Sequence, residues 1–213
     1  MKNQPICYIF AAGEYYEQLP IQTNAQDLVI AVDGGYLYTK QHEIDADFII
    51  GDFDSLSEIP KDKANIIILP QEKDDTDMLA ALREAWQKGF RIFHIYGGTG
   101  GRIDHTLANV QCLAALAKHG GRGYLFGQDV IITAIHNDCI AFSAIPEGIV
   151  SVFSHSEIAS GVFEKGLKYS LENATLKNTY PIGISNEFKG VSSSISVQSG
   201  TLIIVYPKDT KEI

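Results

Sequence analysis

The first 127 residues alternate short apolar runs with amphipathic segments, and this alternation restricts the possible fold more than any other feature of the sequence. The apolar runs are rich in β-branched and aromatic residues and have no polar face, which is typical of strands buried on both faces of a parallel sheet. They span residues 6–12, 28–32, 48–51, 65–69, 91–96 and 123–126. Parallel strands need long crossover connections, usually helices. The pattern therefore predicts an α/β domain over residues 1–127 with a doubly wound, mostly parallel sheet.

Two of the intervening segments are predicted helices with a recognisable beginning and end. The first begins after Thr76 and ends near Gly89, with apolar residues on one face. The second spans residues 103–119 and is followed by two glycines. Leu107 and Leu113 of this second helix are expected to face inward.

After residue 127 the helical periodicity disappears. Short apolar runs follow one another, separated by Gly, Asn, Pro and Ser. They span residues 130–135, 139–144, 149–153, 192–197 and 201–206. Residues 128–213 are therefore expected to form a second, small all-β domain of the sandwich or jelly-roll type.

Charge and cysteine content exclude several classes of protein. There are 17 Lys and Arg against 26 Asp and Glu, a net charge of −9, which disfavours a nucleic-acid partner. The three cysteines, Cys7, Cys112 and Cys139, form no CxxC pair and are expected to be reduced. No run approaches the roughly 18 apolar residues of a membrane span. We expect a cytoplasmic protein without a nucleic-acid or membrane partner.

Acidic residues and glycines gather directly after the predicted strands. Asp33 and Gly34 follow the second strand, Asp52 and Asp54 the third, and residues 72–77, which are mostly acidic, the fourth. Ligands of doubly wound folds bind at the carboxyl ends of the strands. These side chains are therefore expected to lie along one edge of the sheet.

Carboxylates crowded at one edge repel one another unless a cation lies among them. Mg²⁺ takes oxygen ligands and keeps waters that a phosphate can replace. The two-residue period of an extended chain places Asp52 and Asp54 on the same side. Alternatively, Asp54 only starts a turn or a helix, and the acids near residue 75 only stabilise a helix N-terminus. One or two acids would suffice to stabilise the helix N-terminus. Asp74 and Asp77 therefore remain candidate ligands of metal or substrate, and Asp75 is expected to face solvent.

The glycine-rich turn after the fifth strand is suited to a phosphate. It is neither a P-loop nor a dinucleotide-binding pattern. Its glycines allow successive backbone N–H groups to form a concave nest, and the following helix adds a favourable dipole. Thr99 can donate a hydrogen bond and Arg102 offers a bidentate fork. The alternative is a tight turn followed by a surface arginine. The turn consists of Gly97, Gly98, Thr99, Gly100 and Gly101.

Taken in order, the motifs DGG (33–35), GDFDS (51–55), KDDTD (73–77) and GGTGGRIDH (97–105) resemble those of the thiamine pyrophosphokinase (thiamine diphosphokinase) family. GLKYSL (166–171) and GISNE (183–187) in the second domain are also similar, so the resemblance covers nearly the whole chain. It implies Mg²⁺-dependent transfer of diphosphate from ATP to the hydroxyl of thiamine, giving thiamine diphosphate and AMP. It also implies a homodimer whose sites are shared between subunits.

The resemblance also implies roles for particular residues. Carried over by position, Asp52, Asp54 and Asp74 would hold magnesium. Asp54, Asp74, Asp77 and Arg102 would be the catalytic residues. The residues expected to bind ATP or thiamine are Asp33, Gly34, Gly97, Gly98, Thr99, Gly100, Gly101, Arg102, Asp104, Ser185 and Asn186.

The sequence departs from the family pattern in one place. Some members have a tryptophan in the last strand near the thiamine, where this chain has Ile204. Tyr169, Phe188 and Tyr206 are the aromatic residues that could take its place.

Two other functions fit the same motifs. With water as the acceptor, the site would belong to a metal-dependent nucleotide or diphosphate hydrolase. A non-catalytic sensor would bind a nucleotide without turnover. A sensor would not need so many carboxylates, and a hydrolase would not need a second domain to cover an organic acceptor.

Overall fold

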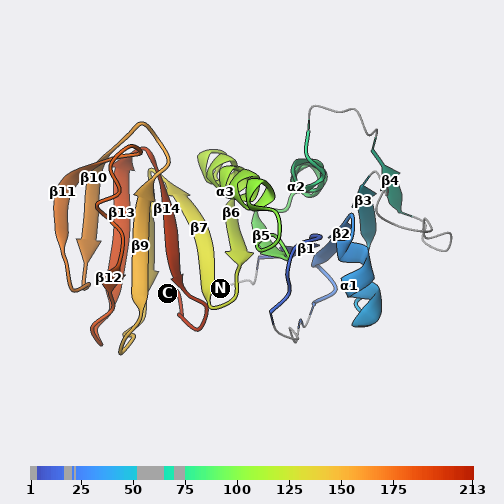
Figure 1. Ribbon diagram of the computed structural model, residues 1–213, viewed down its shortest axis with the longest axis horizontal. Coiled ribbons are helices and arrows are strands. Elements are labelled where there is room, and N and C mark those ends of the chain that lie inside the picture. Colours follow the sequence, from blue (N-terminus) through green and yellow to red (C-terminus); the bar gives the residue numbers. More distant parts are fainter. Residues whose placement is uncertain (1–3, 17–20, 22, 52–64, 70–74) are drawn as a thin grey trace. The chain divides into compact units, whose positions relative to one another are not determined.

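The computed structural model describes residues 4–16, 21, 23–51, 65–69 and 75–213. The chain forms two compact units (Figure 1). Unit 1 consists of Met1–Asn109 and Leu125–Gln128, and unit 2 of Val110–Tyr124 and Asp129–Ile213. The helix α3 (Ile103–Lys118) and the strand β6 (Arg122–Phe126) are each divided between the two units.

Unit 1 contains a parallel sheet with the strand order β5-β1-β2-β3-β4. Its strands are β1 (Ile6–Phe10), β2 (Leu28–Val32), β3 (Phe48–Gly51), β4 (Ile66–Ile68) and β5 (Ile92–Tyr96). Each of these strands lies within a range expected from the sequence, and β6 begins one residue before its expected range. The prediction of an α/β part with parallel strands is confirmed.

Three helices are described, and two of them were predicted. α2 (Asp77–Gln87) begins after Thr76, whose hydroxyl accepts a hydrogen bond from the Leu79 N–H at 3.2 Å. α3 also begins where expected, but Leu107 is 61% exposed and does not face the core as predicted. The short helix α1 (Gly35–Gln41) was not predicted, because seven residues that include Gly, Tyr and Thr give no clear helical period.

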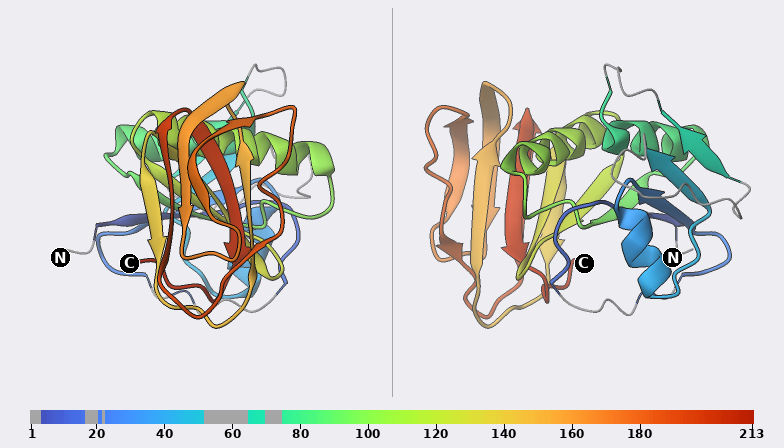
Figure 2. Two further views of the ribbon diagram at one scale, coloured as in Figure 1. Left: turned by 90° about the vertical axis from the view of Figure 1, so that its left-hand side faces the viewer. Right: turned by 45° about the vertical axis from the view of Figure 1, so that its right-hand side comes forward.

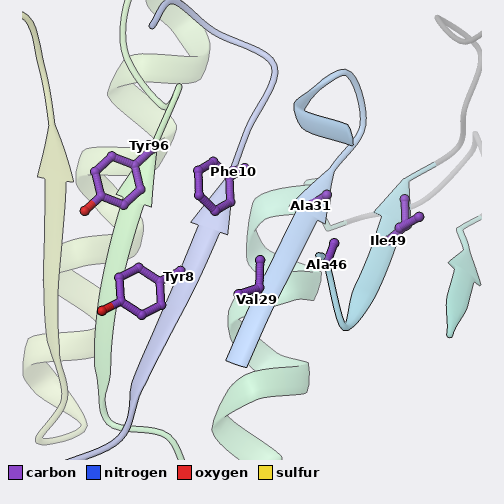
Figure 3. Packing of buried hydrophobic residues seen from close by; sticks show 7 residues of the cluster. All are labelled: Tyr8, Phe10, Val29, Ala31, Ala46, Ile49 and Tyr96. Carbon is purple, nitrogen blue, oxygen red and sulfur yellow. The ribbon is translucent and has the colours of Figure 1, made fainter. Parts of the chain in front are cut away.

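Aromatic residues form the core on one face of the parallel sheet. Tyr8, Phe10 and Tyr96 point to the same side there, together with smaller apolar residues of β2 and β3 (Figure 3). The ring of Tyr38 in α1 stacks on Phe10 with a centroid distance of 5.9 Å.

The opposite face of the sheet is covered by α2. Alternate residues of a strand point to opposite faces, and Trp86 of α2 stacks on Phe93 of β5. Phe93 lies three positions before Tyr96 in β5, so the two side chains point to opposite faces. α1 and α2 therefore pack on opposite faces of the parallel sheet.

Unit 2 is built from two antiparallel sheets, whose strands run from yellow to red in Figure 2. The strand orders are β12-β9-β14-β7 and β11-β10-β13-β8. The sheets pack on each other through rings such as Phe142 on Tyr206, at 5.0 Å. The strands are β7 (Val130–His136), β8 (Cys139–Phe142), β9 (Ile149–Ser154), β10 (Ile158–Lys165), β11 (Leu171–Lys177), β12 (Asn186–Glu187), β13 (Ser193–Ser199) and β14 (Thr201–Pro207). The expected all-β sandwich is confirmed, although β10, β11 and β12 were not predicted.

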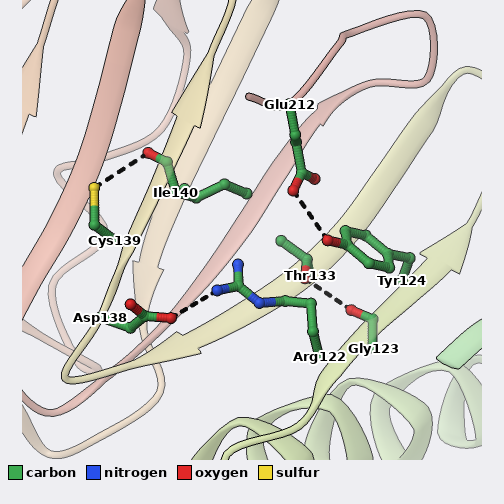
Figure 4. A network of polar contacts seen from close by, with 8 residues as sticks. All are labelled: Arg122, Gly123, Tyr124, Thr133, Asp138, Cys139, Ile140 and Glu212. Carbon is green, nitrogen blue, oxygen red and sulfur yellow. Dashed lines mark hydrogen bonds and ion pairs between the residues drawn. The ribbon is translucent and has the colours of Figure 1, made fainter. Parts of the chain in front are cut away.

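The C-terminal residues are fixed to unit 2 by polar contacts. Glu212 accepts hydrogen bonds from the hydroxyl of Tyr124, at 3.0 Å, and from that of Tyr206 (Figure 4 shows the first). The Ile213 N–H donates to the carbonyl of Ala141 at 3.0 Å. Burial, together with the charge of Glu212, raises the pKa of both tyrosines. Both hydroxyls therefore stay protonated and can donate to the carboxylate.

Among the helices that the structure describes, none is long and apolar enough to cross a membrane.

We expect His94 to make the protein less stable in mild acid. His94 of β5 contacts the rings of Tyr8 and Phe126 at 5.4 and 5.3 Å, and burial lowers its pKa from 6.5 to about 4, against the opposing effect of Asp27. Between these two pH values the unfolded chain binds a proton that the folded chain excludes. The free energy of unfolding should therefore fall by up to about 3 kcal/mol as the pH drops from 6.5 to 4.

The test compares urea unfolding of the wild type and His94→Phe across this pH range. The phenylalanine keeps an aromatic ring at the position and removes the titrating group, so the variant should lose less stability in acid. Equal losses in the two proteins would contradict this role of His94.

Candidate functional site

The loops that follow β1 and β5 are joined by backbone hydrogen bonds. The Gly13 N–H donates to the Gly97 carbonyl at 2.7 Å, and the Glu14 N–H donates to the Thr99 carbonyl at 2.9 Å. Gly97 has φ +62°, and a Cβ atom there would lie 2.5 Å from the carbonyl oxygen of Ala11. Position 97 therefore requires glycine, and the start of the glycine-rich turn is held against the end of β1.

The ends of β2 and β3 also meet. Asp33 has φ +47° and its N–H donates to the Ile50 carbonyl at 2.9 Å. A Cβ atom on Gly51 would lie 2.0 Å from Oδ1 of Asp33, so a larger residue would displace this carboxylate from its present position. A Cβ atom on Gly34 would lie 3.1 Å from the Cβ of Ala12, next to the end of β1. The structure thus brings Asp33, Gly34 and the glycine-rich loop to one edge of the sheet.

The interior of the glycine-rich loop holds several polar groups. Thr99 is 8% exposed, and its hydroxyl has no hydrogen-bond partner among the described residues. The buried Asn109 donates from Nδ2 to the Gly98 carbonyl at 2.7 Å and ties the loop to α3. Gly100 and Gly101 have φ +79° and +59°. Backbone N–H groups in such conformations can form an anion-binding nest.

Arg102 and Asp104, which follow the loop, form an ion pair on the surface. Nη2 of Arg102 lies 2.6 Å from Oδ2 of Asp104, and its Nε donates to Oδ1 at 3.2 Å. The hydrogen bond from Arg102 lowers the pKa of Asp104. The guanidinium side chain, which is 73% exposed, thus holds a carboxylate with the same fork that binds a phosphate.

Asp77 is the first residue of α2. A carboxylate in this first turn is favoured by the helix dipole. Asp75, expected to face solvent, is partly exposed and forms an ion pair with Arg83.

The three expected magnesium ligands, Asp52, Asp54 and Asp74, lie outside the described residues. Within the described ranges, no group of three or more His, Cys, Asp or Glu side chains could hold a metal ion. The sequence nevertheless places Asp52 directly after Gly51, and Gly51 packs on the Asp33 carboxylate. A donor set made only of carboxylates has the chemistry that suits Mg²⁺.

The two candidate residues of unit 2 lie in different environments. Ser185 is exposed with φ +60°, and its N–H donates to Oγ of Ser151 at 3.1 Å. Asn186 is buried, and its side-chain amide makes four hydrogen bonds to other groups of unit 2. Its Oδ1 accepts from the N–H groups of Tyr169 and Glu187, both at 2.9 Å. Its Nδ2 donates to Oε2 of Glu164 at 2.7 Å and to the Tyr169 carbonyl at 2.6 Å. The side chain of Asn186 therefore joins the two motifs of unit 2.

Of the three aromatic candidates for a thiamine contact, one is open to solvent. Phe188 and Tyr206 are buried, whereas Tyr169 is 59% exposed. Because Phe188 and Tyr206 are buried in unit 2, Tyr169 is the one of these three rings that a ligand can contact.

Gly13 and Glu14 were missed by the sequence analysis. They follow β1, and the only local signal is a glycine and an acid shortly after a predicted strand. Four other strand ends carry denser runs of acids and glycines and therefore give a stronger signal. β1 lies between β5 and β2 in the sheet, so its loop reaches the glycine-rich turn directly.

Comparison with known proteins identifies the family. A model described as "Thiamin pyrophosphokinase, catalytic domain" matches residues 20–125, and one described as "Thiamin pyrophosphokinase, vitamin B1 binding domain" matches residues 140–202. Thiamine pyrophosphokinase of Bacillus subtilis is 30% identical over 193 residues, covering 88% of this chain and 90% of the relative. The chain belongs to the thiamine pyrophosphokinase family. It is therefore an enzyme with the catalytic domain of that family.

Solved structures agree with this membership. The crystal structure of the Bacillus subtilis thiamine pyrophosphokinase superposes with a TM-score of 0.83 at 29% identity, over 96% of this chain and 99% of that chain. The thiamin pyrophosphokinase of Candida albicans has a TM-score of 0.72 at 15% identity, over 97% and 90% of the two chains. At that identity the second likeness shows the fold alone.

Gly97→Ala should destabilise unit 1 much more than Gly101→Ala. Both glycines have φ near +60°, which costs another residue roughly 1–2 kcal/mol. A Cβ atom on Gly97 would also strike the Ala11 carbonyl and Tyr15, whereas one on Gly101 would meet nothing within 4 Å. Overpacking adds roughly 1–3 kcal/mol for Gly97→Ala alone. Urea unfolding of both variants measures the difference, and equal losses would show that the loops do not pack as described.

Proposed function

We propose that this enzyme transfers a diphosphate group from ATP to the hydroxyl of thiamine, giving thiamine diphosphate and AMP. The observation that carries this proposal is the glycine-rich loop at the edge of the sheet, in a chain that belongs to the thiamine pyrophosphokinase family. The relatives' names state the acceptor and the group transferred. The loop offers backbone amides and a buried hydroxyl where a polyphosphate can be held.

The triphosphate would be held by the loop residues 97–101 and by Arg102. The hydroxyl of Thr99 lacks a partner among the described residues and can donate to a phosphate oxygen. Arg102 can exchange the carboxylate of Asp104 for phosphate oxygens with its fork geometry unchanged. Phosphoryl transfer depends mainly on positioning and charge stabilisation. These groups would supply both.

Asp52, Asp54 and Asp74 would hold Mg²⁺ beside this loop. When bound, the ion neutralises charge on the phosphate oxygens. The three carboxylates would hold the ion, and Asp33, next to Gly51, adds negative charge at the same edge. An edge with this charge favours the cationic thiazolium ring of thiamine.

We also propose that thiamine is bound with the help of unit 2 and that the enzyme is a homodimer with shared sites. Ser185 is an exposed residue, and Asn186 fixes the backbone of the exposed Tyr169. Large apolar side chains of the same unit, including Tyr180 and Ile184, are also exposed and suit a subunit interface. The cytoplasm, where ATP and thiamine are available, is the proposed location.

The test is an assay of ATP and Mg²⁺ with and without thiamine. We expect AMP to form only when thiamine is present, and Asp54→Asn to reduce turnover by at least about 100-fold because it neutralises a metal ligand. Asp209→Asn makes the same change on an exposed residue of unit 2 and should leave turnover unchanged. Thiamine-independent release of phosphate would indicate a hydrolase instead. Nucleotide binding without turnover would indicate a sensor.

Arg102→Lys should weaken ATP binding although it keeps the charge. A lysine ammonium cannot reproduce the two-atom contact that Arg102 makes with Asp104. Loss of one charge-assisted hydrogen bond predicts a rise in KM for ATP of roughly 10-fold. Arg83→Lys, at an exposed ion pair on α2, is the matched control. If both variants have wild-type kinetics, Arg102 is only a surface residue.

A further inference from the structure

Glu14 places a carboxylate on the glycine-rich loop. The Gly101 N–H donates to Oε1 of Glu14 at 3.2 Å, although the two residues are 87 positions apart. The side chain also covers Gly100, because a Cβ atom there would lie 2.6 Å from Cδ of Glu14. An anionic group of the chain itself thus occupies an amide of the proposed phosphate-binding nest.

This contact can be exchanged without disturbing the loop. At 3.2 Å it is at the long end of the N–H···O range, and it is exposed to solvent. The backbone bonds from Gly13 to Gly97 and from Glu14 to Thr99, at 2.7 and 2.9 Å, do not involve the side chain. The carboxylate can therefore turn away while the backbone of Glu14 continues to hold the loop.

The buried hydroxyl of Thr99 is a second sign that the loop accepts a ligand. Burying a hydroxyl without a hydrogen bond is costly, and Thr99 has no partner among the described residues. An incoming anion would give this hydroxyl an acceptor and would replace the Glu14 carboxylate on Gly101. Binding is then an exchange of one anion for another.

We propose that Glu14 is a displaceable internal anion that competes with the substrate polyphosphate for the Gly101 amide. This inference rests on the proposed function, because it takes the loop as the triphosphate site. A ligand must offset the lost Glu14 contact and the repulsion from the carboxylate. The competition therefore favours polyphosphates, which make several contacts, over singly charged anions, which make few. Glu14, in the loop after β1, would thus determine which anions the glycine-rich loop binds.

Glu14→Gln tests the proposal, because glutamine keeps the length and an acceptor oxygen but removes the charge. We measure binding of magnesium inorganic triphosphate to the full chain by calorimetry at low ionic strength. The Kd should fall about three- to tenfold in Glu14→Gln, and the gain should shrink in high salt, which screens the repulsion. Glu43→Gln is the matched control, because it changes the net charge by the same amount. Glu43 precedes β3, at the amino ends of the strands, so this variant should leave the Kd unchanged.

The alternative is that the Glu14 carboxylate only supports the loop. In that case Glu14→Gln would bind triphosphate as the wild type does, or less tightly, and Glu14→Ala would bind still less. Either result, or no detectable binding by wild type and variant, would overturn the proposal. Thermal unfolding of each variant checks that the fold is retained. Thiamine-dependent formation of AMP by the wild type tests the proposed function separately, so each can fail while the other stands.

Discussion

Backbone hydrogen bonds between the loops after β1 and β5 determine the geometry of the candidate phosphate site. The two strands pair in parallel, with Phe10 opposite Tyr96, so their loops leave the sheet side by side. The carbonyls of Gly97 and Thr99 point at the β1 loop, where they accept the N–H groups of Gly13 and Glu14. In a trans peptide the N–H points away from the carbonyl. The amides of Gly98 and Gly100 therefore point away from the β1 loop, whereas the Gly101 N–H contacts Glu14 of that loop.

The charge of the chain opposes the binding of a polyphosphate, since the net charge is −9. Two donors suited to phosphate already hold carboxylates of the chain, because Gly101 contacts Glu14 and Arg102 contacts Asp104. Each donor is satisfied within the chain, so the binding proposed here would replace one anion with another. Under the proposed function, the acidic groups close to these donors would influence which anions the site accepts.

The parallel strands could be predicted because their neighbours bury both faces, which leaves uninterrupted apolar runs in the sequence. β2 is buried at every position and matches its expected range. β11 (Leu171–Lys177) is mostly exposed, so no apolar run marks it. β10 (Ile158–Lys165) contains Gly161 with φ +64° and shifts in register beside it, which hide its alternation. The exposed Leu107 shows the same limit in a helix, because periodicity identifies an apolar face but not what covers it.

The candidate site could be predicted where chemistry is concentrated in one segment, as in the glycine-rich loop. Glu14 could not, because its contact with Gly101 depends on β1 and β5 being neighbours in the sheet. Ser185 and Asn186 illustrate a different limit. One short motif marked both residues, but the structure exposes the first and buries the second. Asn186 uses its amide in four hydrogen bonds within unit 2. Ser185 is thus the exposed residue of this pair, the one that a ligand can reach.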